Sequence, residues 1–386
     1  MHIILMIVGA VVVYLLLKRI YQKNWNRHLS CDISFSASNA VCGDTVELVE
    51  VVTNYKKLPL PIIHLKFQAD NALIFKDGSE NTKTTDSTYR DDVFSLFMDQ
   101  RITRRIPVTC TQRGVYGVRN IELIFNGLFM DDVSVYKVKS ISSLTVYPDP
   151  YLYEDMDILY SRVLGLVERN SLINPDPFAF RQIREYEIND PMNTINWKAS
   201  ARSGSLMVNQ FNETTCQEVC ILLNLEPEGM LVYNRLSEAS ISIAAGIAET
   251  LLDSGISVGI LSNGRDYDTE ENIFIHPEGD AAHIKNIDTG LARINLSAGQ
   301  DEFVSMIKSY TDDFTRQIFD NENNTEMLYI LISQNSRSEI VDTFNSIIGK
   351  DADNIFIVPH FRDKEINLDS CNGTVIPWEV THNAKG

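Results

Sequence analysis

The hydrophobic pattern of this chain changes its period near residue 150, and this change limits the folds that the chain can adopt. From about residue 30 to residue 148, short runs of alternating apolar and polar residues are separated by Gly, Asn, Asp and Pro. Several strands that each bury one face, with turn residues between them, predict an antiparallel β-sandwich. The polar stretch 76–92, rich in Thr, Ser and Asp, predicts a long exposed loop between strands.

After residue 150 the pattern changes to apolar strands that alternate with helices. Apolar residues at three-and-four spacing predict a helix within 151–180, broken near residues 174–177. Further strands are predicted at 206–211, 219–225, 257–261, 327–332 and 354–358, and helices at 236–253, 281–292, 301–309 and 339–348. This alternation predicts a mainly parallel sheet covered on both faces, in a Rossmann-like α/β domain. Residues 361–386 are predicted to be an irregular tail with a short strand around 375–378.

The N-terminal segment from Ile3 to Leu17 contains only apolar or small residues. It is slightly shorter than the roughly 17 to 25 residues of a usual spanning helix. The cations come after it, at Lys18, Arg19, Lys23 and Arg27. A signal peptide carries its cations before the apolar core, so we expect a single-pass anchor in the lipid bilayer of the cell membrane, with the body in the cytoplasm. Tyr14, Tyr21 and Trp25 are expected to add interfacial contacts, and a cleaved or buried segment is the alternative.

The net charge and the cysteines of the chain indicate which partners and which cellular compartment to expect. A formal net charge of −18 argues against nucleic acid, because the field of so acidic a chain repels a polyanion. The six cysteines contain no CxxC pair, so free thiols are expected, as in a reducing cytosol.

The stretch 181–211 contains the start and stop signals of one short helix. Asp190 is suited to cap the helix, Pro191 suits the first helical position, and Gly204 suits its end. We therefore expect a helix over about 191–203. Lys198 and Arg202 are four residues apart and lie on one face of it, a like-charge pair that something anionic would stabilise.

The same stretch resembles the signature of the bacterial and archaeal family called domain of unknown function 58, whose pattern reads roughly REYxxGDPxRxINWKASAR. The matching residues are Arg184, Glu185, Tyr186, Asp190, Pro191, Ile195, Asn196, Trp197, Lys198, Ala199, Ser200, Ala201 and Arg202. The chain departs from the pattern at Asn189, where Gly is usual, and at Asn193 or Thr194, where Arg is usual. The resemblance extends from about residue 29 to residue 360.

This resemblance implies a von Willebrand factor A-like domain over 216–360 and a link to MoxR-type AAA+ ATPases. It divides the chain into an anchor with its basic flank (1–28), a β-sandwich (29–150), a linker helix with the signature element (151–215), the α/β domain (216–360) and a tail (361–386). Trp197 either fills the seam between the domains, with Arg184, Tyr186 and Asp190 around it, or anchors a partner. The residues expected to form the interaction site are Arg184, Tyr186, Asp190, Pro191, Asn196, Trp197, Lys198, Ser200 and Arg202.

A von Willebrand factor A-like domain with a metal site would carry Asp-x-Ser-x-Ser after its first apolar strand, because a hard cation needs carboxylate and hydroxyl oxygens in one loop. Here the loop contains Asn224, Glu226 and Glu228, a degenerate version of that site. Mg²⁺ is the ion that such a loop would hold, but we expect no metal and no cofactor.

No catalytic constellation stands out in the sequence. His276 and His283 have no HExxH frame, His360 stands alone after a strand, and there is no GxxxxGK[ST] phosphate loop. We therefore expect a non-enzymatic adaptor or assembly protein. The alternative is an envelope-associated hydrolase or transferase with an unrecognised active site.

Overall fold

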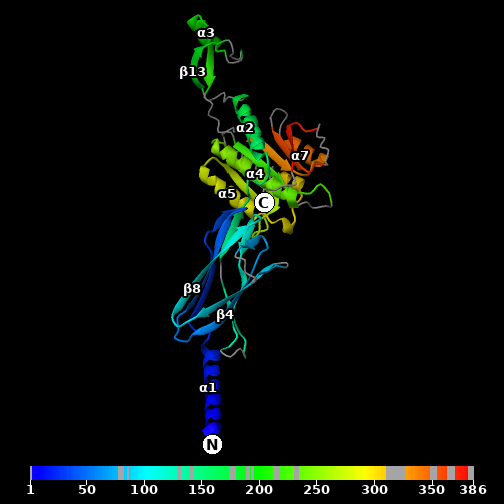
Figure 1. Cartoon of the computed structure of the whole chain (residues 1–386). Coiled ribbons are helices and arrows are strands. Elements are labelled where there is room, and N and C mark those ends of the chain that lie inside the picture. The colour runs from blue at the N-terminus through cyan, green and yellow to red at the C-terminus, as the bar shows by residue number, and fades with distance from the viewer. Residues whose placement is uncertain are drawn as a thin grey trace. The chain divides into compact units, whose positions relative to one another are not determined.

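The computed structural model describes residues 2–76, 82–84, 87–127, 132–139, 142–173, 180–187, 192, 195–211, 218–229, 234–309, 327–347, 354–362 and 370–380. The chain divides into two compact units, Met1–Asp149 and Pro150–Gly386 (Figure 1). Each unit has its own hydrophobic core, so each is described by itself.

The first unit begins with helix α1, His2–Asn24, which contains the predicted apolar segment. Its mean hydropathy reaches 2.4, and none of that apolar window is buried by other residues. By length and composition α1 is long and apolar enough to cross a membrane.

Two antiparallel sheets form the body of the first unit. One has the order β1-β3-β8-β5, formed by Leu29–Phe35, Thr45–Asn54, Gln100–Cys110 and Leu73–Phe75. The other has the order β11-β10-β4-β7-β6, formed by Ser134–Val138, Arg119–Phe125, Leu60–Ala69, Thr88–Leu96 and Thr82–Thr84. A small third sheet, β2-β12-β9, contains Asn39–Val41, Ser143–Tyr147 and Gly114–Gly117. Alternate residues of β3, such as Leu48 and Val52, lie in one core with Leu65 and Leu123 of the second sheet.

The prediction of a loop over 76–92 is wrong for its last part, because Thr88 begins β7. The inward positions of β7 include Arg90 and Asp92, which are buried. These charges interrupt the apolar alternation that identifies a strand. Asp92 binds both Arg90 and Arg104, and the latter distance, from Nη1 to Oδ1, is 2.7 Å. Arg90 and Asp92 can be buried because they pair with each other. A pattern of apolar and polar residues does not reveal such a pair.

Tyr21 and Trp25 do not make the expected interfacial contacts. Both are buried, and their rings stack on Phe125 with centroid distances of 5.8 and 5.7 Å. Helix α1 and the residues that follow it are therefore joined to the β unit by its own core.

The second unit contains a six-stranded sheet with the order β17-β16-β15-β18-β19-β20. Its strands are Asn272–Glu278, Ser257–Arg265, Glu218–Asn224, Met327–Ser333, Ile355–His360 and Thr374–Glu379. Neighbouring strands are parallel except β16 and β17. The central strands are apolar on both faces, as expected for parallel strands covered by helices.

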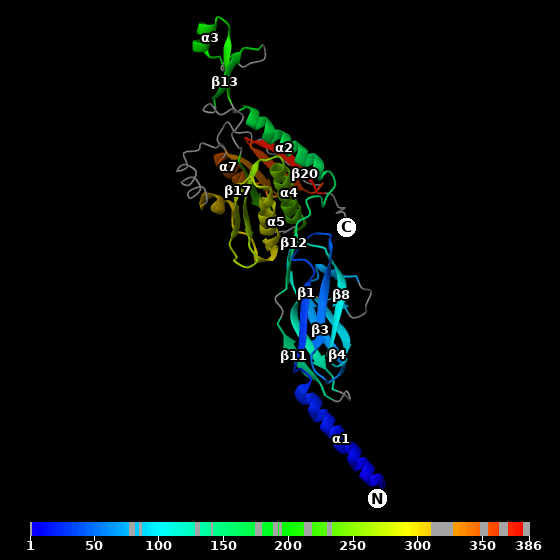
Figure 2. The ribbon, with the colours of Figure 1, turned by 90° about the vertical axis from the view of Figure 1, so that its left-hand side faces the viewer.

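Helices cover both faces of this sheet. The helices α2 (Met156–Ile173), α4 (Asn234–Asp253) and α5 (Ile284–Arg293) share one core with Val219 and Ile221 of β15 (Figure 2). On the other face, α7 (Ser338–Ile347) and the helical turn 303–309 pack with Cys220 and Leu222.

Three expectations for the second unit need correction. Helix α2 is not a linker, because Met156, Tyr160 and Val163 are buried in the core of the α/β body. Strand β17 was not predicted, because only Ile273 of this antiparallel edge strand is buried and Pro277 interrupts its strand pattern. The region after residue 360 is not only a tail, because β20 pairs in parallel with β19 along its whole length. The short strand predicted around 375–378 lies within β20.

Candidate interaction site

The family-like stretch folds as a small module of its own. Strand β13, Phe180–Glu185, pairs antiparallel with β14, Met207–Phe211, and the short helix α3, Trp197–Ser203, lies between them in the chain (Figure 1). We call residues 180–187 and 195–211 the signature hairpin. The strand predicted at 206–211 is therefore present, but it pairs with β13 in a two-stranded sheet.

Helix α3 begins later than the sequence predicts. Ile195 is buried and bridges antiparallel to Val208, so the chain is still extended there. The N-cap is Asn196, whose Oδ1 accepts a hydrogen bond from Ala199 N at 2.9 Å. The end of the helix is as predicted, because Gly204 has a left-handed backbone with φ of 76°. Asp190 and Pro191 lie outside the described residues.

Asn196 and Ser200 hold α3 against β14. The Asn196 amide Nδ2 donates to Asn209 Oδ1 at 2.7 Å, and its backbone N donates to Met207 O at 2.8 Å. The Ser200 hydroxyl donates to Asn196 O and accepts from Met207 N, each at 2.8 Å. These two signature residues therefore have structural roles inside the hairpin.

Unlike Asn196 and Ser200, the side chains of Trp197, Lys198 and Arg202 point away from the hairpin's own interior. Trp197 is 67% exposed, and both cations are exposed as well. Trp197 belongs to no hydrophobic core of the described residues, and the interpretation that it fills an interdomain seam stays a prediction. Met192 and Leu206 add further exposed apolar side chains from the same stretch. The signature hairpin thus presents an aromatic ring and two cations to its surroundings, and not to its own interior.

The two remaining predicted site residues lie on or next to β13. Arg184 is half-buried in β13, and its Nη1 donates to the carbonyl of Glu185 at 3.0 Å. Tyr186 follows the strand, and its backbone N donates to Leu206 O at 2.9 Å.

In the α/β body, the strand order reverses between β15 and β18. Open α/β sheets bind ligands at the carboxyl end of such a switch point. Here this end of the sheet contains buried polar side chains that bind one another: Asn224 Nδ2 donates to Ser333 Oγ at 3.0 Å, and Asn263 Nδ2 donates to Asn224 Oδ1 at 2.9 Å. Asn263 Oδ1 in turn accepts from Leu225 N at 2.8 Å. Asn224 and Asn263 are therefore hydrogen-bonded by the protein itself, whereas the buried Nδ2 of Asn335, two residues after Ser333, has no hydrogen-bond partner in the described part of the chain.

In the loop predicted to be a degenerate metal site, which contains Asn224, Glu226 and Glu228, the side-chain oxygens also bind protein groups. Asn224 Oδ1 accepts a second hydrogen bond, from Glu226 N at 2.9 Å. The Glu226 carboxylate pairs with Arg337, and Glu228 Oε1 accepts from Ser336 Oγ at 3.4 Å. Since the oxygens that Mg²⁺ would need already have protein donors and a guanidinium partner, this donor set does not fit a divalent cation.

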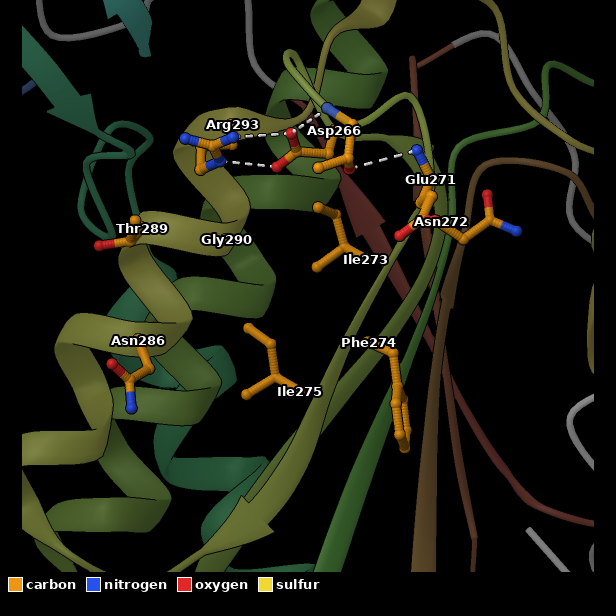
Figure 3. A pocket seen from close by; sticks show the side chains of 11 residues that line it. Asp266, Glu271, Asn272, Ile273, Phe274, Ile275, Asn286, Thr289, Gly290 and Arg293 are labelled. Carbon is orange, nitrogen blue, oxygen red and sulfur yellow. Dashed lines mark hydrogen bonds and ion pairs between the residues drawn. The ribbon is translucent and has the colours of Figure 1, made fainter. Parts of the chain in front are cut away.

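A shallow groove of about 350 Å³ lies between β17 and α5 (Figure 3). Ile273 and Ile275 point toward α5, and Asp266 and Arg293 stand at one end. Arg293 Nε donates to Asp266 Oδ2 at 2.6 Å, and this bond lowers the pKa of Asp266 to about 2. Two backbone amides also donate to the Asp266 carboxylate, so the pair fixes the turn before β17 and offers no free acid or base.

The predicted histidines do not converge on a site within the described part of the chain. His283 is buried, with Nε2 3.0 Å from Val258 O and Nδ1 3.2 Å from Glu278. His276 lies on β17, and the ring of His360 contacts the neighbouring carbonyl of Phe361. In the ranges that the structure describes, no three His, Cys, Asp or Glu side chains form a group that could hold a metal.

Comparison with known proteins matches the region that contains the hairpin. The model of the family described as Protein of unknown function DUF58 matches residues 182–301. Uncharacterized protein YeaD of Bacillus subtilis (strain 168) is 29% identical over 116 residues, which is 30% of this chain and 26% of that relative. The chain thus aligns with about a quarter of the length of this relative.

Comparison with solved structures gives matches of low TM-score. A non-cellulosomal cohesin from Archaeoglobus fulgidus is 14% identical, with a TM-score of 0.20, over 30% of this chain and 91% of the cohesin. A CARDB domain from Pyrococcus furiosus is 15% identical, with a TM-score of 0.20, over 31% of this chain and 91% of the domain. The sixth cohesin of scaffoldin B from Acetivibrio cellulolyticus is 11% identical, with a TM-score of 0.23, over 30% and 99%.

Proposed function

We propose that this protein is a non-enzymatic adaptor, anchored in the cell membrane by α1, that binds a protein partner through the exposed face of the signature hairpin. The observation that carries the proposal is the exposure of Trp197 beside Lys198 and Arg202. Trp and Arg dominate the binding energy of protein interfaces, because they bury large areas and make several contacts at once. A tryptophan that contributes little to its own fold is available for such a contact.

The proposed partner is a MoxR-type AAA+ ATPase. This class comes from the resemblance to domain of unknown function 58, and the chain has no phosphate loop of its own that could supply ATP-driven work. The two exposed cations of the hairpin favour an acidic patch on the partner, because opposite charges attract across an interface.

We further propose that the α/β body is Rossmann-like, of the von Willebrand factor A-like kind, and works without a bound metal. Numbered within the sheet by their order in the chain, its strands run 3-2-1-4-5-6, the order of doubly wound sheets. The hydrogen bonds among Asn224, Asn263 and Ser333 at the switch point, and the Glu226–Arg337 pair, support a body that binds proteins by its faces. A hydrolase or transferase would need an open site, and it remains the alternative.

Substitutions on α3 test the proposed interface. Trp197→Ala, and separately Lys198→Glu with Arg202→Glu, should abolish retention of the partner in detergent co-purification. The thermal midpoint should barely change, because exposed positions shift stability by no more than about 0.5 kcal/mol. The measurements are pull-down with mass spectrometry and thermal melting of each purified variant.

Tyr89→Ala serves as the matched control, since Tyr89 is also a half-exposed aromatic but lies in the first unit. It should retain the partner. If the charge-reversed protein keeps its partner, the two cations are not part of the interface. An activity of the purified protein alone, lost on substitution of one residue, would instead favour the enzymatic alternative.

The orientation of the anchor is a separate expectation. Because Lys18, Arg19, Lys23 and Arg27 follow the apolar segment, a C-terminal tag should resist protease added to bacterial spheroplasts. The tag should be digested once the membrane is permeabilised. Digestion of the tag in intact spheroplasts would place the body outside the cytoplasm and remove a cytosolic ATPase as the partner.

A further inference from the structure

One end of the β unit is defined by its connection to α1. Leu29, the first residue of β1, pairs with Asn54 at the end of β3, and Asn54 pairs with Gln100 at the start of β8. The loop 55–59 after β3 and the turn 97–99 before β8 therefore lie at the end where α1 enters. We call these two segments the α1-end loops.

The α1-end loops are held together by a buried side chain. Asn54 is fully buried, and its Nδ2 donates to Leu58 O at 3.0 Å and to Phe97 O at 2.8 Å. The backbone N of Tyr55 donates to His28 O at 2.9 Å, which ties the first loop to the segment after α1. The two loops are thus one ordered platform beside the base of α1.

This platform exposes large apolar side chains. Tyr55 is 65% exposed, Phe97 is 68% exposed and Met98 is 58% exposed. Adjacent exposed apolar residues on tied loops mark a contact surface more often than isolated ones do. Lys23, Arg27 and Lys57, at the same end, are exposed cations.

The position of the platform along α1 indicates its depth. The apolar segment of α1 ends at Leu17, and Lys18 and Arg19 begin the headgroup layer, because charges are costly in the hydrocarbon core. Tyr21 and Gln22 follow about 4.5 and 6 Å beyond Lys18, at a rise of 1.5 Å per residue, within that layer. Since Tyr21 stacks on Phe125, and Gln22 binds Asp132, the end of the β unit begins at this level.

We propose that the α1-end loops form a membrane-contact surface, in which Tyr55, Phe97 and Met98 enter the interfacial layer of the bilayer that holds α1. Aromatic side chains favour this layer because one end of the ring is apolar and the other meets water, and Lys23, Arg27 and Lys57 meet anionic headgroups there. This inference rests on the proposed membrane anchoring. It adds a second attachment, which limits how far the β unit can tilt about its anchor.

Photo-crosslinking of the full-length protein in lipid nanodiscs tests the proposal. A benzophenone amino acid is placed, one position at a time, at Tyr55 or Phe97, at Tyr89 as a control, and at Tyr14 within α1 as a reference. Tyr89 is a half-exposed aromatic of β7 about 23 Å along the strand from Leu96, the residue at the α1 end, at 3.3 Å per residue. The measurement is the yield of lipid adduct by mass spectrometry, in nanodiscs with and without anionic lipid.

Positions 55 and 97 should give a lipid adduct yield about tenfold above position 89, because a side chain in the interface is surrounded by lipid. Yields equal to that of position 89, with strong labelling at position 14, would overturn the membrane-contact surface and leave the anchoring intact. An absence of lipid adduct at position 14 would overturn both. Equal yields with and without anionic lipid would overturn the role of the three cations.

Discussion

Asp92→Ala should destabilise the β unit by about 3–5 kcal/mol, the cost of breaking a buried ion pair by removing one partner. The Asp92 carboxylate is buried between Arg90, which is also buried, and Arg104, at 2.7 Å from Nη1. Without Asp92, the Arg90 guanidinium would keep its charge in the core, although its ring contact with Phe75, at 5.2 Å, would remain. The loss therefore exceeds that of an ordinary surface pair.

A second carboxyl group, that of Glu50, is buried close to the Asp92 carboxylate in the native protein. Burial, with Asp92 nearby, raises the pKa of Glu50 to about 8 from 4.5, so its carboxyl group is protonated at pH 7. Because the folded-state pKa is the higher one, the β unit should lose stability as the pH rises from about 4.5 to about 8. The pH dependence of the thermal midpoint reports this loss.

Calorimetry should resolve the effect of Asp92→Ala on the first unit, since the two units need not unfold together. Glu47→Ala is the matched control: Glu47 pairs with Arg105 at 3.3 Å on the exposed face, where a pair is worth about 0–1 kcal/mol. If the two variants melt at the same temperature, the buried pair contributes no more than a surface one.

Gly246→Ala should destabilise the α/β body by about 3 kcal/mol, at the upper end of overpacking costs. Gly246 is buried in α4, and a Cβ there would lie 2.1 Å from Cζ of Tyr160 on α2. Tyr160 cannot move away cheaply, because its hydroxyl donates to the carbonyls of Pro150 and Ser242. The added methyl group must therefore separate α2 from α4.

Gly165→Ala, within α2, is the control, because the same substitution there is expected to stabilise the protein. A Cβ at Gly165 meets nothing within 4 Å, so the higher helix propensity of Ala should raise stability by about 1 kcal/mol. Thermal melting of both variants measures the difference. If Gly246→Ala is as stable as Gly165→Ala, then α2 does not pack closely on α4, and the assignment of α2 to the α/β body fails.

The parts of the site that the sequence predicted were those set by neighbouring residues. Gly204 ends α3 because its lack of a Cβ permits the left-handed backbone, whatever surrounds it. The start of α3 could not be predicted, because two residues, Asp190 and Asn196, can both cap a helix. The bridge of Ile195 to Val208, thirteen residues away in the chain, keeps Ile195 itself extended and selects Asn196.

Sequence alone determined the elements whose apolar residues are consecutive: the segment within α1, and the central strands β15, β18 and β19. Such apolar runs can adopt few environments, because they must be covered by protein on all sides or lie in lipid.

Only the tertiary structure decided which aromatic and polar side chains are buried. Trp25 is buried because Phe125, a hundred positions away, stacks on it, whereas Trp197 stays exposed because the Asn196 and Ser200 side chains hold α3 to β14 without it. Asp92 and Asn224 are buried because Arg90, Arg104, Asn263 and Ser333 bind them there, and burial of a polar group depends on a partner that the residue's own neighbourhood in the chain does not specify.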